Sequence, residues 1–182
     1  MKKLVVLLLM MALVFFSSSA MAQNQGYLEA KIGFDVMGEI DYEINSPDVD
    51  SGVTIAGEYK IPMDNVWTYG AGLAYQLDRE IDDPDGGEFN FTSIYALGQY
   101  DLADSSTYLV GHLGYNTFDG DGDNIDYSGG LYYGLGAGFV FGETSNYTAE
   151  FLYSVNNGEY EDGPDTYDVD YSKITMSVGM RF

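Results

Sequence analysis

KITMSVGMRF, residues 173–182, alternates between apolar and other side chains without a break. The even positions hold the apolar side chains, which are Ile174, Met176, Val178, Met180 and Phe182. The odd positions hold polar or small residues from Lys173 to Arg181. Because successive side chains of a β-strand point to opposite faces, this stretch predicts a strand with one wholly apolar face.

Seven further segments alternate in a similar way. With the first stretch they give eight predicted strands, at residues 27–36, 52–60, 67–77, 91–100, 107–115, 129–141, 147–155 and 170–182. Most have about the 9–11 residues that a tilted membrane strand needs. Long acidic connections at 37–51, 78–90, 116–128 and 156–169 alternate with short ones at 61–66, 101–106 and 142–146. This order predicts an all-β fold, an eight-stranded antiparallel up-and-down transmembrane β-barrel with both termini on the short-turn side.

The first residues have the pattern of a secretory signal peptide. Lys2 and Lys3 form a basic start, an apolar run covers residues 4–16, and Ala20-Met21-Ala22 forms a small-residue cleavage site. We therefore expect residues 1–22 to be a signal peptide and residues 23–182 to form the barrel domain. An N-terminal membrane anchor is the alternative, which the cleavage site disfavours.

The composition limits the partners. The chain has 7 Lys and Arg against 29 Asp and Glu, and residues 1–22 hold two of the cations, so residues 23–182 have a formal charge of 5 − 29 = −24. Such acidity argues against nucleic acid as a partner and against electrostatic binding of anionic lipid. The chain has no cysteine, which excludes a disulfide framework.

Periodicity alone does not say whether the apolar face points outward to lipid or inward, as it would in a soluble barrel. Two observations favour an outward orientation of the apolar face. The apolar set is too bulky and aromatic for one small interior. Its aromatic residues also gather at both ends of the strands, for example Trp67 and Phe141 near the short turns and Phe34 and Tyr153 near the long connections. Two such girdles are typical of the two membrane interfaces. In segment 91–100, where the pattern is ambiguous, we expect Ile94 to face outward and Tyr95 and Leu97 inward.

Three stretches carry a resemblance to a known family: YLEAKIGF at 27–34, GLYYGLGAGFVFGETSNYTAEFLYS at 130–154 and SVGMRF at 177–182. In this order the chain resembles the small outer-membrane β-barrel proteins of the OmpA transmembrane-domain, OmpX and Ail type, the porin-like outer-membrane β-barrel domain family. The resemblance implies a location in the Gram-negative outer membrane, in contact with its lipid and lipopolysaccharide. It also implies that Phe182 belongs to a C-terminal signal read by the barrel-assembly machinery. We expect a monomer.

Charged residues fall on the predicted inward faces. They are Glu29, Lys31, Glu58, Lys60, His112, Glu150, Lys173 and Arg181. A Lys or Arg facing lipid at the bilayer midplane costs roughly 2–4 kcal/mol, which explains their position. We expect a network of salt bridges that fills the lumen, since an eight-stranded barrel is just wide enough for side chains. The alternative is a gate in which ion pairs exchange partners.

The single histidine does not predict catalysis. Outer-membrane lipid A deacylases use a lipid-facing His and Ser on one strand, whereas His112 falls on an inward face beside Val110 and Gly114. We therefore expect a lumen histidine and no enzyme.

The third long connection holds a weak metal-binding pattern. Asp119, Asp121, Asp123 and Asp126 resemble the start of a calcium loop, but Asn124 replaces the expected Gly and Gly130 stands at the twelfth position. We expect no cofactor, with divalent cations loosely bound at an acidic rim formed by loop residues such as Asp82, Asp83, Asp85, Glu88, Glu159, Glu161, Asp162 and Asp165. A solvated acidic loop and adaptation to a saline habitat remain alternatives.

The sequence thus predicts an outer-membrane barrel with a structural or surface-interaction role, whose acidic extracellular loops meet an extracellular ligand. The alternative function is a narrow, cation-preferring porin-like channel.

Overall fold

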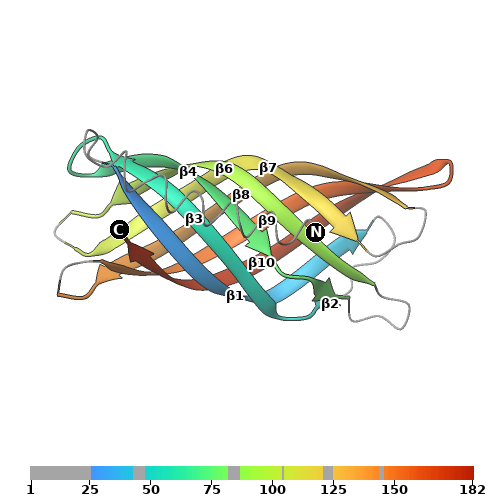
Figure 1. Ribbon diagram of the computed structural model, residues 1–182, viewed down its shortest axis with the longest axis horizontal. Helices are drawn as coiled ribbons and strands as arrows, with labels where there is room; N and C mark the ends of the chain where they lie inside the picture. The colour runs from blue at the N-terminus through green and yellow to red at the C-terminus, as the bar shows by residue number, and fades with distance from the viewer. Residues whose placement is uncertain (1–25, 43–47, 82–86, 104, 121–124, 144–145) are drawn as a thin grey trace.

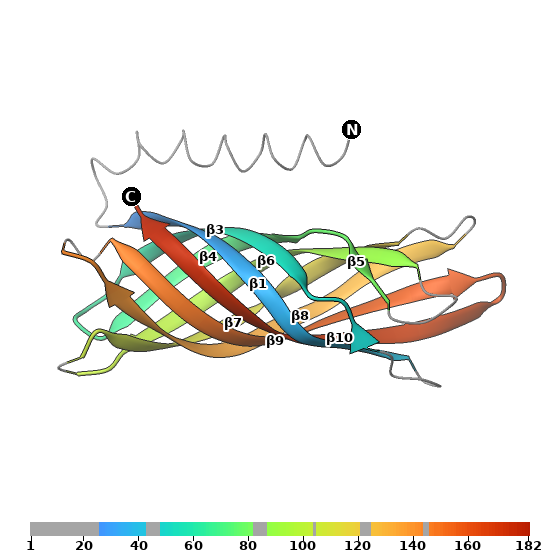
Figure 2. The ribbon, with the colours of Figure 1, turned by 90° about the horizontal axis from the view of Figure 1, so that it is seen from below.

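The computed structural model describes residues 26–42, 48–81, 87–103, 105–120, 125–143 and 146–182. They form one antiparallel sheet that closes on itself (Figures 1 and 2). The strands are β1 (Tyr27–Tyr42), β2 (Asp48–Val49), β3 (Gly52–Pro62), β4 (Trp67–Gln76), β5 (Arg79–Glu80), β6 (Glu88–Asp101), β7 (Thr107–Gly120), β8 (Asp126–Phe141), β9 (Tyr147–Asp162) and β10 (Asp165–Arg181). Within these residues there is no helix long and apolar enough to cross a membrane.

Eight long strands make the wall of the barrel, and pairing of the first with the last closes it. Strand β1 pairs with β10 from Glu29↔Arg181 to Tyr42↔Val169, while every other neighbour in the wall is the next long strand along the chain. In the described residues each of the eight long strands is therefore hydrogen-bonded to two neighbours, as a bilayer requires, since it does not tolerate an open sheet edge. The prediction of an eight-stranded up-and-down barrel is confirmed.

The predicted strand ends are wrong at one end of the barrel. We call the end that carries the connections after β1, β4, β7 and β9 the outer end. Toward it, β1 and β6 to β10 run several residues further than predicted, and the expected loop 156–169 is a continuous hairpin of β9 and β10. Gly163, with φ of +65°, sits in the tight turn of this hairpin, a conformation that glycine adopts without steric cost. In Figures 1 and 2 the hairpin projects furthest from the end where β10 terminates.

Two short strands complete the ring at the outer end, where β3 and β4 stop early. Strand β2 pairs with β1, β5 pairs with β6, and a bridge between Val49 and Ile81 joins β2 to β5. The amide of Asp50 also donates a hydrogen bond to the carbonyl of Glu80 at 3.1 Å. The wall above the β3–β4 hairpin therefore consists of two segments expected to be loops.

Between the short turns and the outer end, the barrel presents an apolar outer surface. Ile32, Ile94, Leu113, Leu135 and Phe151 are each more than half exposed there. Aromatic side chains flank this band, with Trp67 against Tyr100 (ring centroids 4.9 Å apart) near the short turns and exposed Tyr115 toward the outer end. This arrangement suits a hydrocarbon layer between two interfaces. The predicted facing of segment 91–100 is confirmed, because Ile94 is exposed while Tyr95 and Leu97 are buried.

The polarity of the two faces inverts toward the outer end. In β10 the outward positions change from Ile174 and Met176 to Asp168 and Asp170, whereas the inward positions change from Lys173 to Tyr171 and Val169. The apolar side chains that turn inward pack together as an aromatic cap, consisting of Ile40, Val49, Phe89, Phe91, Phe118, Val169 and Tyr171. This end therefore has an apolar core and a water-facing surface, as a soluble barrel has.

Candidate functional site

The interior of the barrel is organised in levels that follow the inward residues of β1. They are given from the short-turn end, called lower, to the outer end, called upper. Glu29 and Lys31 lie in a lower ion-pair layer, Gly33 borders a cavity, Asp35 lies in an upper ion-pair layer and Ile40 belongs to the aromatic cap. Pleating places every second side chain of this strand inside, and the irregularity between Val36 and Glu39 shifts the alternation so that Ile40 also points inward. One strand thus contributes to each level.

The lower ion-pair layer consists of Glu29, Lys31, Glu58, Lys60, Glu150 and Arg181. Lys31 Nζ lies 2.9 Å from both Glu58 Oε2 and Glu150 Oε2, and Lys60 Nζ lies 2.9 Å from Glu58 Oε2. Lys60 also bonds Glu29 at 3.0 Å, which Arg181 Nε approaches at 3.4 Å. Three cations thus face three carboxylates, so the layer is neutral.

Neutral side chains complete the hydrogen bonding of this layer. Tyr95 donates its hydroxyl to Glu58 at 2.8 Å, Tyr108 donates to Glu150 at 3.0 Å and Thr148 donates to Glu29 at 2.6 Å. Each carboxylate therefore has more than one partner, which is the condition under which buried charges become tolerable.

The upper ion-pair layer consists of Asp35, Arg79 and Lys173. Asp35 Oδ2 accepts from Arg79 Nη2 at 2.5 Å, from Lys173 Nζ at 2.9 Å and from Thr54 Oγ1 at 2.6 Å, while Oδ1 accepts from Thr175. Two cations share one carboxylate here, so among the described side chains this layer has an excess of one positive charge. Arg79 belongs to the segment 78–90 that the sequence predicts as a connection, but it is buried, because β5 folds into the wall and turns it inward.

His112 lies between the lower layer and the cavity. Its ring stacks on Tyr95 with centroids 4.3 Å apart, Nδ1 lies 3.2 Å from the hydroxyl of Tyr132 and Nε2 lies 3.8 Å from Glu58 Oε1. These contacts pack and orient the imidazole inside the barrel.

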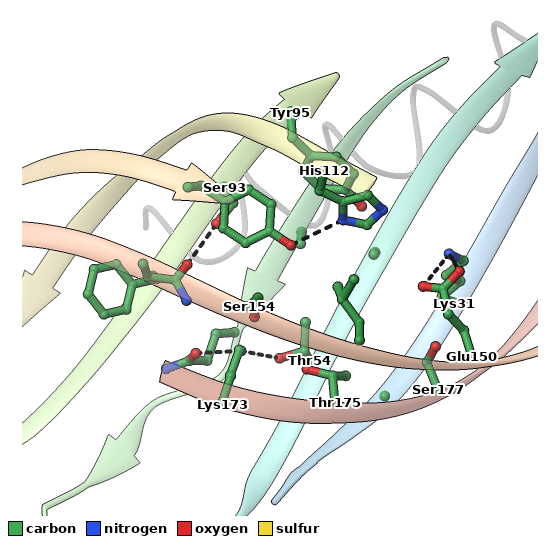
Figure 3. A pocket seen from close by; sticks show the side chains of 18 of the residues that line it. Lys31, Thr54, Ser93, Tyr95, His112, Glu150, Ser154, Lys173, Thr175 and Ser177 are labelled. Atoms are coloured by element: carbon green, nitrogen blue, oxygen red, sulfur yellow. Dashed lines mark hydrogen bonds and ion pairs between the residues drawn. The ribbon is translucent and has the colours of Figure 1, made fainter. Parts of the chain in front are cut away.

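A cavity of about 40 Å³, lined by both apolar and polar side chains, separates the two layers (Figure 3). Lys31 and Glu150 border it from one side and Lys173 from the other, with Ser154, Thr175 and Ser177 between them. We call this cavity the chamber. It has room for a few water molecules or one small ion.

The outer end is acidic on its water-facing surface. Pairs of exposed carboxylates stand directly opposite each other on neighbouring strands, among them Asp41↔Asp170, Glu39↔Asp48, Glu80↔Glu88, Asp126↔Glu161 and Glu159↔Asp168. All five Lys and Arg residues that follow residue 22 point into the barrel, so among the described residues the exposed charged side chains are carboxylates alone.

The predicted calcium loop stays a prediction. Asp119 lies one residue before the end of β7, opposite Asn90, and Asp126 begins β8 opposite Glu161, while Asp121 and Asp123 lie outside the described residues. Asp82, Asp83 and Asp85 of the predicted rim also lie outside them.

All eight charged residues placed inward from the sequence lie inside the barrel, and seven of them contact one another directly or through a shared partner. Lys173 stands apart, in the upper layer. Sequence reasoning missed Asp35 and Arg79 as members of the interior site. The inward position of Asp35 in β1 was a usable signal, whereas Arg79 had none in its local pattern.

Comparison with known proteins agrees with this geometry. Residues 8–182 match the family model described as outer membrane protein beta-barrel domain, and the chain belongs to this family. No curated protein matches the sequence. Among solved structures, the barrel is similar to Ail, the attachment invasion locus protein of Yersinia pestis, with a TM-score of 0.57 and 17% identity over 86% of this chain and 99% of that one.

Two further structures show the same fold. The outer membrane protein AlkL has a TM-score of 0.54 and 15% identity over 87% of this chain and 91% of its own. Neisserial surface protein A has a TM-score of 0.52 and 18% identity over 86% of this chain and 97% of its own. At these identities the likeness concerns the fold.

Proposed function

We propose that this chain is a non-enzymatic barrel of the Gram-negative outer membrane, whose acidic outer end interacts with cationic partners at the cell surface. The observation that carries the proposal is the separation of charge: each Lys and Arg after residue 22 points inward, and exposed carboxylates line the outer end. Such a surface attracts basic proteins and collects divalent cations, which bridge carboxylates to lipopolysaccharide phosphates. Short turns of such barrels face the periplasm, so the outer end faces outside.

The closed interior supports this scaffold over the channel alternative. The lower ion-pair layer fills the lumen near the short turns, and above it Phe91, Tyr171 and Val169 of the aromatic cap are at most 1% exposed. An ion crossing the barrel would have to pass both. The expected result in a planar bilayer is silence from inserted, folded protein, whereas discrete cation-preferring openings would favour the channel.

The charge of the partner distinguishes this chain from a structural relative. Ail of Yersinia pestis has been crystallised in complex with the heparin analogue sucrose octasulfate, a polyanion. An outer end with carboxylates as its exposed charges repels such a ligand. We therefore expect this barrel to bind a fluorescent oligolysine probe and not to bind sucrose octasulfate.

The test compares three proteins in lipid nanodiscs at low salt. A variant with Glu159→Gln, Glu161→Gln, Asp168→Asn and Asp170→Asn should lose at least tenfold in oligolysine affinity. Glu143→Gln, an exposed carboxylate at the short-turn end, is the control and should bind as the parent does. Parent binding should also weaken as salt rises. Equal binding by the parent and the fourfold variant would contradict the proposal.

A further inference from the structure

We infer that the chamber holds one small monovalent anion of halide size, which neutralises the excess positive charge of the upper ion-pair layer. The inference concerns the interior and does not depend on what binds at the outer end.

Charge balance gives the first argument. The lower layer is neutral, with three cations and three carboxylates, whereas Lys173 and Arg79 share the single carboxylate of Asp35. Lys173 and Arg79 are 5% and 2% exposed. An uncompensated charge buried at this depth is costly, and a counter-ion beside it removes that cost.

Unpartnered donors give the second argument, independent of the first. Gln76 accepts from Lys173 Nζ at 2.7 Å through Oε1, which leaves its amide nitrogen as a donor, and that nitrogen has no protein acceptor among the described residues. Asn156 likewise accepts from Ser93 at 3.2 Å and leaves its Nδ2 without a protein acceptor. Both side chains are 2% exposed and both line the chamber.

Together these groups favour an anion over a cation or an apolar ligand. Lys173 supplies charge, the amides of Gln76 and Asn156 supply N–H donors and Ser154 adds a hydroxyl group. The carboxylates of Glu58 and Glu150 on the same lining are already paired with Lys31. Buried donors are normally satisfied, and a halide accepts several hydrogen bonds at once. The size of about 40 Å³ suits a monatomic ion and is too small for a bulky organic anion.

The first measurement is anomalous diffraction from protein refolded and crystallised in sodium bromide. The expected result is a bromide peak inside the chamber, within hydrogen-bonding distance of the amide nitrogens of Gln76 and Asn156. Lys173→Met should abolish the peak, because Asp35 then pairs with Arg79 alone and the layer becomes neutral. Ser177→Ala changes an uncharged residue of the same lining and should keep the peak.

The second measurement follows urea unfolding while bromide replaces gluconate at constant ionic strength. Above the dissociation constant, each tenfold rise in bromide should raise the folded-to-unfolded ratio of the parent about tenfold. Lys173→Met should show no bromide dependence, and Ser177→Ala should behave as the parent. An empty or water-filled chamber in the parent would overturn the inference. A bromide peak that survives Lys173→Met would also overturn it, since charge balance would then not hold the ion.

Discussion

Replacing Lys31 with Met tests whether the lower ion-pair layer is a dry plug or a hydrated gate. Lys31 Nζ contacts Glu58 and Glu150 at 2.9–3.0 Å and Glu29 at 3.8 Å, and its side chain is 4% exposed. Without it two cations face three carboxylates, and one carboxylate stays buried without its charge partner. Breaking a buried pair in this way costs about 3–5 kcal/mol, whereas a solvent-exposed pair contributes about 0–1 kcal/mol. The two descriptions of the lumen thus predict clearly different free energies of unfolding.

The double variant Lys31→Met/Glu150→Gln supplies the matched control. It returns the layer to two cations and two carboxylates, and the amide that replaces the Glu150 carboxylate keeps an oxygen that accepts from Tyr108. Because the unpaired charge is gone, we expect this variant to regain at least about 2 kcal/mol relative to Lys31→Met.

The assay is equilibrium urea unfolding in lipid vesicles, approached from the folded and the unfolded side. Trp67 is the only tryptophan of the chain and lies in the exposed aromatic girdle near the short turns, so its emission reports departure from the membrane interface. A cost below about 1 kcal/mol for Lys31→Met, with no recovery in the double variant, would refute the dry plug. The lumen would then behave as a solvated pore, and the channel alternative would gain support.

Three further outcomes test the cap, the wall and a turn. Phe91→Ala should cost about 3–5 kcal/mol in urea unfolding, because Phe91 is 1% exposed and stacks on Phe118 at 4.8 Å, and a loss below about 1 kcal/mol would contradict a packed cap. Gly114→Ala should cost about 1–3 kcal/mol in the same assay, since its Cβ would overlap the carbonyl oxygen of Ile94, while Gly57→Ala, with nothing within 4 Å, should be nearly neutral. Asp64 accepts from the amides of Val66 and Trp67 at 2.8 and 2.7 Å, which holds its carboxyl pKa below the usual value, as an NMR titration should show. The stabilisation from this depressed pKa is present above the unfolded pKa and is lost as pH falls through the folded pKa; Asp64→Asn should remove this dependence.

The membrane-spanning part of the fold was predictable because it obeys a single rule. Lipid outside and a narrow polar lumen inside force apolar and polar side chains to alternate, so residues such as Ile174 and Lys173 reveal both the strand and its facing. Segment 91–100 also follows this rule, because the polar Gln99 and Tyr95 lie on the same face of the strand and are both buried, and Tyr95 donates to Glu58.

The strand ends at the outer end were predicted wrongly, because there the outward positions are polar and the inward positions are apolar. Water lies outside the wall at this level, so acidic residues such as Asp168 and Asp170 face outward and apolar ones such as Val169 face inward. Stretches of this kind, dense in Asp, Gly and Asn, have the composition of loops, although residues 165–171 still alternate. The available signal was that the alternation continues without a break while the inward and outward positions exchange polarity. The capture of Arg79 by Asp35 depends on a contact between residues 44 positions apart, and no local pattern carries it.

The same separation of charge connects the interior with the surface. A barrel that confines its few cations to the lumen stabilises the buried carboxylates, and it also leaves the outer surface without positive charges to neutralise its acidic residues. Opposed pairs such as Glu159 and Asp168 then destabilise the outer wall, by roughly 0.2–1 kcal/mol each. The apolar contacts of the aromatic cap, which hold the same strands together from inside, offset this repulsion. A strongly acidic surface on this wall therefore depends on the inward-facing apolar core, and a cationic partner of the kind proposed would relieve the repulsion that the cap offsets.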